Sequence, residues 1–295
     1  MTSPHSPMQS PHLDAALSAP LPTGVVLAAT PLGNIGDATP RLSRLLAEAD
    51  VVAAEDTRRT RALAQALGVE IGGRVVSNFD HNEEQRVEML LAAARTGTVA
   101  VVTDAGMPVV SDPGLRLVSA ALDAGVPVSC VPGPSAVPTA LALSGLDVGR
   151  FIFDGFAPRR DGARRTWLES LRGEKRAVCF FESPHRVADT LALAAEILGA
   201  ERRVAVCREL TKTYEEVRRG PLGEVAQWAA EGVRGEVTVV LDAAQEAEVS
   251  VETLVPEVLE RVEQGERLKA VCKELAAAHG VRTRELYDAA LAARG

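Results

Sequence analysis

Short apolar runs alternate with longer amphipathic segments over the first half of the chain. The apolar runs are rich in Val and Ala and have the length of a buried β-strand. Continuous apolar strands joined by helices are typical of a mainly parallel sheet that is covered on both faces. We therefore predict strands at residues 25–29, 51–54, 74–77, 99–102 and 128–131, and helices at residues 40–49, 58–67, 83–95, 115–124 and 136–144. Thr39 and Pro40 form a good helix start, since a side-chain cap precedes a proline in the first turn.

A second series of the same kind begins near Phe151, so the pattern predicts two α/β domains. The segment 146–150 is the expected hinge, which places the first domain at residues 22–146 and the second at 147–243. The second series predicts strands at residues 151–153, 177–181, 203–207 and 237–241, and helices at residues 164–172, 185–198 and 222–231.

The remaining residues, 244–295, are predicted as a linker and a helical extension. Residues 242–266 hold eight carboxylates and one Arg, and their first part is the expected linker. Short helices with small turns between them follow, at residues 254–262, 268–279 and 283–293. This pattern fits a helix-turn-helix-like unit, and it fits a plain helical cap about equally well.

The first 21 residues differ in composition from the rest. They are rich in Pro, Ser, His and Ala, which favours a disordered tail over residues 1–21. They lack the basic start and the apolar core of a secretory signal. The longest apolar runs of the chain are strand-sized, far below the roughly 18 residues of a membrane span. We expect no membrane partner.

Composition and charge exclude several other classes. Of the 295 residues, 46% are hydrophobic and 24% are charged, which is ordinary for a globular protein. With 32 basic and 40 acidic residues the net charge is −8, so a coat that binds nucleic acid non-specifically is not expected. The four cysteines are scattered, and we predict that they are reduced and buried in a cytoplasmic protein. The five histidines show no zinc-like spacing, and no metal is predicted.

Loops rich in Gly, Pro and Asp follow the predicted strands of the first half. Ligands of parallel sheets bind beyond the carboxyl ends of the strands, and small residues let backbone amides approach a ligand closely. The dinucleotide fingerprint and the Walker A loop are both missing, so a nicotinamide cofactor or a bound nucleoside triphosphate is disfavoured. The loops span residues 30–36, 55–60, 104–108, 111–114 and 132–136.

The second half adds two polar loops and a basic cluster. His185 follows Glu182 in a strand-to-helix loop, and this position fits both a structural and a functional role. Residues 151–180 hold seven basic and four acidic side chains, a local charge of +3. A solvated helix face explains such a cluster, and so does a phosphate-contacting surface that includes Arg58, Arg59, Arg61 and Lys212.

Eight motif blocks occur in these loops in a fixed order. They are Thr30-Pro31-Leu32-Gly33-Asn34, Ala54-Glu55-Asp56-Thr57-Arg58, Asp80-His81-Asn82-Glu83, Thr103-Asp104-Ala105-Gly106-Met107-Pro108, Ser111-Asp112-Pro113-Gly114, Pro132-Gly133-Pro134, Phe181-Glu182-Ser183-Pro184-His185-Arg186 and Arg208-Glu209-Leu210-Thr211-Lys212. With these blocks the chain resembles the bacterial methyltransferases that act on the cytidine 2′-hydroxyl of small-subunit ribosomal RNA, a branch of the tetrapyrrole methylase superfamily. The likeness covers about residues 22–243, and the last 45 residues are similar to the helix-turn-helix extension of that family. Met107 stands where Thr is common in the family, and Phe79 where His is often found.

The resemblance implies a fold, a cofactor and a substrate. The fold is two α/β domains with S-adenosylmethionine in the cleft between them, and the substrate is 16S rRNA in the 30S subunit, near the decoding centre. A homodimer is implied as well. Transferred by motif, the cofactor-binding residues are Asp104, Ala105, Gly106, Met107, Ser135, Ala136, Phe181 and Thr238. The residues expected to face the RNA are Pro31, Gly33, Asn34, Arg58, His81 and His185.

The implied reaction needs a group that accepts the proton of a hydroxyl, a poor nucleophile. The candidate carboxylates are Glu182, Glu209 and Asp56, among which the sequence makes no choice. Lys212 and Arg208 are expected to hold the RNA phosphate or to lower the pKa of the hydroxyl, as is Arg58. Two other readings stay open: a methylase of a porphyrin-like small molecule, and an adapter without enzymatic activity that only senses a nucleoside.

Overall fold

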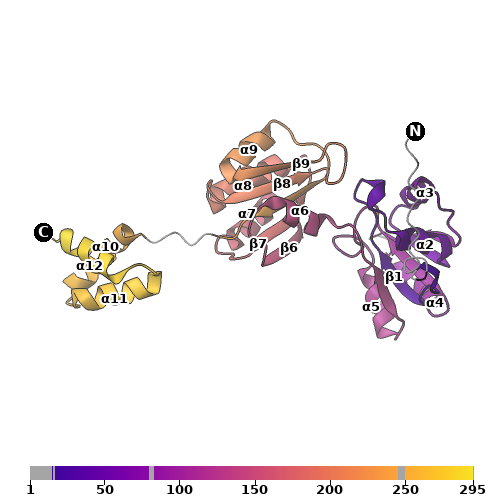
Figure 1. Ribbon diagram of the computed structural model, residues 1–295, viewed down its shortest axis with the longest axis horizontal. Helices are drawn as coiled ribbons and strands as arrows, with labels where there is room; N and C mark the ends of the chain where they lie inside the picture. The colour runs from indigo at the N-terminus through magenta and orange to yellow at the C-terminus, as the bar shows by residue number, and fades with distance from the viewer. Residues whose placement is uncertain (1–14, 16, 80–82, 245–249, 295) are drawn as a thin grey trace, which may run out of the picture. The chain divides into compact units, whose positions relative to one another are not determined.

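The computed structural model describes residues 15, 17–79, 83–244 and 250–294. The chain divides into two compact units, Met1–Ala243 and Ala244–Gly295 (Figure 1). Most of the predicted tail at 1–21 lies outside the described residues, as does His81. No helix in the described part of the chain is long and apolar enough to cross a membrane.

The first sheet is entirely parallel, as its apolar strands predict. Its strand order is β3-β2-β4-β1-β5, with crossovers between strands that are not consecutive in sequence. Residues of β2 and β4 are buried throughout, because helices lie on both faces of the sheet. The strands are β1 (Gly24–Ala28), β2 (Val51–Ala54), β3 (Arg74–Ser77), β4 (Thr98–Val102) and β5 (Val128–Val131).

Two separate cores hold the helices against this sheet. Leu42, Leu45 and Leu46 of α2 (Pro40–Glu48) pack on one face, together with α3 (Thr57–Ala66). Leu90 of α4 (Glu83–Ala94) and Leu117 of α5 (Leu115–Asp123) pack on the other face. Alternate residues of each strand point into the two cores, as the pleat of a strand requires.

The predicted start of α2 is confirmed: the Thr39 side chain accepts a hydrogen bond from the Leu42 amide at 3.1 Å. A short 3-10 turn, η1 (Ile35–Asp37), precedes it.

The second sheet is mixed, with strand order β6-β7-β10-β8-β9. Only β6 and β7 pair in parallel, and the other pairs are antiparallel. The edge strand β9 was not predicted, because its exposed Arg218 and Arg219 hide the apolar pattern of a strand. The strands are β6 (Phe151–Phe156), β7 (Ala177–Glu182), β8 (Arg203–Arg208), β9 (Glu216–Pro221) and β10 (Val237–Leu241).

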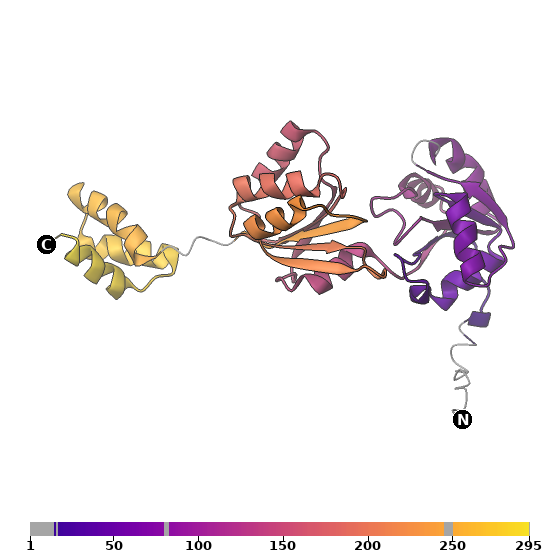
Figure 2. The same ribbon diagram turned by 90° about the horizontal axis from the view of Figure 1, so that it is seen from above.

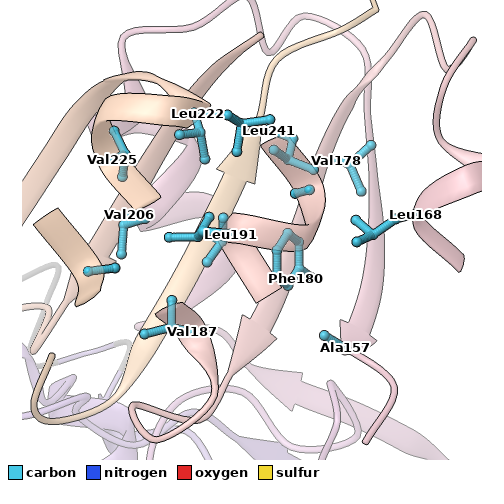
Figure 3. Packing of buried hydrophobic residues seen from close by; sticks show 14 of the residues in the cluster. Ala157, Leu168, Val178, Phe180, Val187, Leu191, Val206, Leu222, Val225 and Leu241 are labelled. Atoms are coloured by element: carbon cyan, nitrogen blue, oxygen red, sulfur yellow. The ribbon is translucent and has the colours of Figure 1, made fainter. Parts of the chain in front are cut away.

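The second sheet is also covered on both faces. One face carries α7 (Asp161–Ser170), α8 (Val187–Leu198) and α9 (Leu222–Ala230), whose apolar side chains surround Phe180 and Leu191 (Figure 3). The other face carries α6 (Ala136–Ser144), whose Val137 and Ala140 pack against strands β7, β8 and β10. Helix α6 therefore follows the strands of the first sheet in sequence, but its buried side chains pack against the second sheet.

The unit at the C-terminus is a three-helix bundle with its own core. Leu254 and Val258 of α10 (Val251–Glu263) pack against Val271 and Leu275 of α11 (Leu268–His279), and α12 (Thr283–Ala292) closes the bundle (Figure 2). Gly280 ends α11 in the left-handed conformation, at a φ of 70°. The three predicted helices are confirmed, each within about three residues of its bounds.

All four cysteines are free thiols, and three of them are buried. Burial raises the pKa of Cys179 to about 12 and that of Cys207 to about 11, so both thiols stay protonated near neutral pH. Cys130 differs from the prediction, because it is only partly buried on the edge strand β5.

Candidate functional site

A cavity of about 400 Å³ opens at the carboxyl ends of the first-sheet strands. Its size is typical of a small-molecule site. Residues of both sheets line it, from the loops after β1, β2 and β4, the start of α6, and the ends of β6, β7 and β10. All eight residues predicted to bind a cofactor are in the lining: Asp104, Ala105, Gly106, Met107, Ser135, Ala136, Phe181 and Thr238.

Asp104 is held in the cavity wall by the loop that follows β2. Its Oδ1 accepts a hydrogen bond from the Asp56 amide at 3.2 Å, and its Oδ2 lies 3.2 Å from a guanidinium nitrogen of Arg59. Its own amide donates to Oε2 of Glu55 at 3.1 Å. Burial raises the pKa of Asp104 above its usual range although the Arg59 charge opposes this. The result is a partly desolvated carboxylate that is fixed in position in the cavity lining.

The loop after Asp104 is folded tightly against the first strand. Gly106 and Thr30 exchange two backbone hydrogen bonds, of 2.9 and 3.0 Å. Val109 and Ser111 both have positive φ angles, of 75° and 65°, which side-chain-bearing residues rarely adopt. Such strain is retained where the surroundings determine the backbone, and it clusters at binding sites. Ser111 is in the cavity lining.

The second sheet contributes an aromatic wall. The ring of Phe181, in β7, meets the rings of Phe153 and Phe156 edge to face, with centroids 5.0 and 5.3 Å apart. Thr238 lies opposite Phe181 in the register of β10 and β7 and is buried. The cavity wall therefore offers an aromatic surface as well as carboxylates, which suits a ligand with an aromatic part and a charged part.

Glu182 lines the cavity, but its carboxylate is fully engaged by its own loop. Oε1 accepts from the Ser183 amide at 2.7 Å and pairs with Arg186. Oε2 accepts from the Thr190 hydroxyl at 2.7 Å, and the side chain is buried. A buried carboxylate with three partners is suited to hold the start of α8 in place. This environment favours positioning over proton transfer for Glu182.

Glu209, Lys212 and Glu236 form a charged cluster at the edge of the cavity. The Lys212 ammonium lies 2.8 Å from Oε1 of Glu209 and 3.1 Å from Oε2 of Glu236. Burial lowers the pKa of Lys212, but the hydrogen bonds to both carboxylates outweigh it and raise the pKa overall. The Lys212 ammonium holds the pKa of Glu209 below its usual range. Of the three, only Glu236 is in the lining.

The first loop of the chain packs directly on this cluster. The Asn34 amide donates to the Thr211 hydroxyl at 3.1 Å. A Cβ on Gly33 would lie only 2.2 Å from Cγ of Lys212, so glycine is required for the close approach. The structure thus brings Gly33 and Asn34, predicted to face the substrate, against the predicted catalytic Lys212.

We expect Gly33→Ala to lower the rate of the reaction that the sequence predicts by about tenfold, because the added methyl group displaces the Lys212 stem and hence its ammonium. The measurement is the single-turnover rate at saturating cofactor. Gly162→Ala is the matched control, since a Cβ there meets nothing within 4 Å. An unchanged rate for Gly33→Ala would show that the position of Lys212 does not matter.

The other predicted residues lie outside the cavity lining. Asp56 caps α3, accepting from the Arg58 amide at 2.7 Å, and this bond together with the Arg58 side chain lowers its pKa. Arg58 is exposed beside it, at 3.3 Å. Arg208 pairs with Glu216 across β8 and β9 at 2.6 Å. Pro31 is half-buried and His185 is exposed. His81 falls outside the described residues.

Several lining residues were not predicted. Glu55 belongs to a quoted motif block and Arg59 directly follows it, but neither was assigned to the site; their polar side chains in the segment after β2 are the signal that could have found them. Glu236 and Phe156 carry no local signal, since only tertiary pairing brings them to the cavity. The others are Leu32, Val110, Ser111, Asp112, Ser183, Pro184 and Gly235. Among the residues that the structure describes, no group of three or more His, Cys, Asp or Glu could hold a metal ion.

Comparison with known proteins adds a family to this geometry. The family described as "Tetrapyrrole (Corrin/Porphyrin) Methylases" matches residues 24–226. A relative from Mycobacterium tuberculosis named "Ribosomal RNA small subunit methyltransferase I" is 59% identical over 273 residues, which cover 92% of this chain and 95% of the relative. A relative of the same name from Escherichia coli O157:H7 is 38% identical, over 90% of this chain and 94% of its own.

Solved structures show the same fold at lower identity. A uroporphyrin-III C-methyl transferase from Thermus thermophilus, complexed with S-adenyl homocysteine, is 23% identical with a TM-score of 0.52, and the match covers 75% of this chain and 98% of that one. The methyltransferase CobJ is 20% identical with a TM-score of 0.58, over 76% of this chain and 95% of its own. These likenesses support the two-sheet α/β fold predicted from the sequence.

Proposed function

The chain belongs to the tetrapyrrole methylase family, in the branch of the ribosomal RNA small subunit methyltransferase I proteins, and on that basis we propose that it methylates small-subunit ribosomal RNA with S-adenosylmethionine as the methyl donor. The observation that carries the proposal is 59% identity across 92% of the chain to a relative of that name. The acceptor we propose is the 2′-hydroxyl of a cytidine in 16S rRNA, near the decoding centre, as the motif resemblance implies.

The cavity suits the proposed methyl donor. Ala105, Gly106 and Ala136 leave room for a ligand against the backbone, and Asp104 offers a fixed carboxylate to its polar groups. Phe181 offers an aromatic edge to its adenine. When bound, S-adenosylmethionine supplies an electrophilic methyl group. The contribution of the cavity is alignment, which is a large part of the acceleration in a displacement reaction.

The acceptor hydroxyl must lose a proton as its oxygen bonds to the methyl carbon. Lys212 is a cation near the cavity and retains its charge to a higher pH than an ordinary lysine. We propose that this charge stabilises the negative charge that develops on the hydroxyl oxygen. Glu209 and Asp56 have lowered pKa values, which makes them weak proton acceptors. Glu236, which lines the cavity and pairs with Lys212, is our candidate for receiving the proton.

We propose further that the protein acts in the cytoplasm, where ribosomal subunits are assembled, and as a homodimer. The preferred substrate is the assembled 30S subunit rather than naked RNA. Proteins that modify one RNA nucleotide recognise the shape of the folded RNA and a nucleotide that is splayed out of its helix. The acidic net charge of −8 supports this, since it limits non-specific binding to RNA.

The direct test uses tritiated S-adenosylmethionine, the purified protein, 30S subunits from cells that lack the protein, naked 16S rRNA and a tetrapyrrole. We expect label in the 30S subunits, less label in naked RNA, and resistance of one cytidine linkage to alkaline hydrolysis, which a 2′-O-methyl group confers. Label in the tetrapyrrole alone would replace the proposal by small-molecule methylation. Cofactor binding without label in any acceptor would favour an adapter.

A further inference from the structure

The segment 156–160 leaves the second sheet at the rim of the cavity. Pairing of β6 with β7 shifts register between Phe153 and Phe156, and Gly155 has a φ of 68° in this irregularity. An irregularity of this kind re-aims the side chain that follows it. Phe156 consequently lines the cavity while its side chain remains 60% exposed. An aromatic ring so exposed at the mouth of a site is not explained by packing alone.

Hydrogen bonds fix this segment to the cavity wall. The Ala157 amide donates to the Phe181 carbonyl at 3.0 Å, and Ala157 itself is buried. The Arg186 guanidinium donates to the Ala157 and Pro158 carbonyls at 3.4 to 3.5 Å while it pairs with Glu182. Phe156 and the residues after Pro158 are therefore held at a defined place beside the cavity.

Arg159 and Arg160 follow directly, and their charges are uncompensated. Both side chains are exposed, and within the described part of the chain neither has a carboxylate in salt-bridge distance. The next two arginines along α7 differ, because Arg164 pairs with Asp161 at 2.5 Å and Arg165 with Glu196 at 2.9 Å. Two adjacent cations without partners, on a chain of net charge −8, mark a place that attracts an anion.

We propose that Phe156, Arg159 and Arg160 form the edge of the site that binds single-stranded RNA: the ring stacks on the target base, and the two guanidinium groups contact the phosphates beside it. This inference rests on the proposed function and specifies its substrate contacts. Single-stranded RNA is held by this combination, an aromatic platform for a base that has left its helix and cations along the backbone. Phe156 supplies the platform at the cavity that binds the methyl donor, so the ribose of the stacked nucleotide lies next to the donor.

The experiment compares Phe156→Leu, Phe156→Trp and the double variant R159Q/R160Q with two matched controls. Phe151→Leu removes an aromatic ring that is 46% exposed at the other end of the same strand. Arg172→Gln removes an exposed arginine that has no ion pair in the described residues and lies past the far end of α7. For each protein we would measure kcat and KM with 30S subunits, the dependence of KM on salt, and the Kd of S-adenosylmethionine by calorimetry.

We expect Phe156→Leu to raise KM for the 30S subunit by roughly 5- to 100-fold, the range expected for loss of one stacked base, and Phe156→Trp to stay near wild type. R159Q/R160Q should raise KM and reduce the slope of log KM against log salt by about 1.4, since each phosphate contact on single strands contributes about 0.7. The cofactor Kd and both controls should remain unchanged.

Two results would overturn this assignment. If Phe156→Leu weakened S-adenosylmethionine binding and left KM for the subunit unchanged, Phe156 would belong to the cofactor site. If R159Q/R160Q behaved like Arg172→Gln, the arginine pair would make no phosphate contact. A wild-type protein that transfers no label to 30S subunits would instead refute the proposed function, and this inference with it.

Discussion

Replacing Asp104 by Asn is expected to weaken S-adenosylmethionine binding by about 10- to 100-fold, the range of a lost charge-assisted hydrogen bond. The Asp104 carboxylate is held by the Asp56 amide and Arg59, and it lines the cavity. The substitution removes its negative charge while the side chain keeps nearly the same shape. Calorimetric titration measures the effect. Asp123→Asn is the control, since it makes the same change at an exposed position, the last residue of helix α5.

The pH dependence provides a second readout. Because burial raises the pKa of Asp104, this carboxyl gains a proton at a higher pH than an exposed aspartate. Wild-type affinity should therefore fall as the pH is lowered through that raised pKa, while the affinity of Asp104→Asn stays flat there. If Asp104→Asn bound the cofactor normally but lost activity, Asp104 would act on the acceptor side of the site.

The first sheet could be predicted in detail because its signal is local. Residues of β2 and β4 are apolar throughout, since both faces are covered, and each turn after them is polar. The second sheet was predicted less completely than the first. The direction of a strand is set by its pairing with segments that are distant in sequence, so the residues of one apolar segment do not indicate it. The polar edge strand β9 has exposed arginines at Arg218 and Arg219 and gains its strand structure from pairing with β8.

The lining of the cavity was predicted more fully than the charged cluster beside it, for a physical reason. Backbone close to a ligand needs small residues in fixed turns, and these form contiguous motifs such as Asp104 to Met107. Acceptor chemistry uses charges whose role depends on their neighbours. Glu182 and Glu209 look equivalent in sequence, yet the first is buried with Thr190 and Arg186 while the second faces Lys212. Glu236 reaches the cluster only because β10 pairs with β8, so nothing near it in sequence indicates its role.

Lys212→Met is expected to lower the single-turnover rate with 30S subunits by about 10²- to 10³-fold, the usual cost of removing one group that stabilises developing charge. The substitution also leaves Glu209 and Glu236 as like charges without the ammonium between them. The cofactor Kd should change little, since Lys212 is not in the cavity lining. Lys212→Arg retains the charge and should recover part of the rate.

The pH profile separates an electrostatic role for Lys212 from a merely structural one. If the ammonium eases loss of the hydroxyl proton, the rate of Lys212→Met should climb with pH. At higher pH, hydroxide in solution favours the loss of this proton, which the cation favours in the wild-type protein. The wild-type rate should remain level over the same range, since the raised pKa of Lys212 keeps its charge in place. A rate that is equally low at every pH, with a lowered melting temperature, would assign Lys212 to holding the Gly33 loop instead. A wild-type rate in Lys212→Met would remove this residue from the reaction altogether.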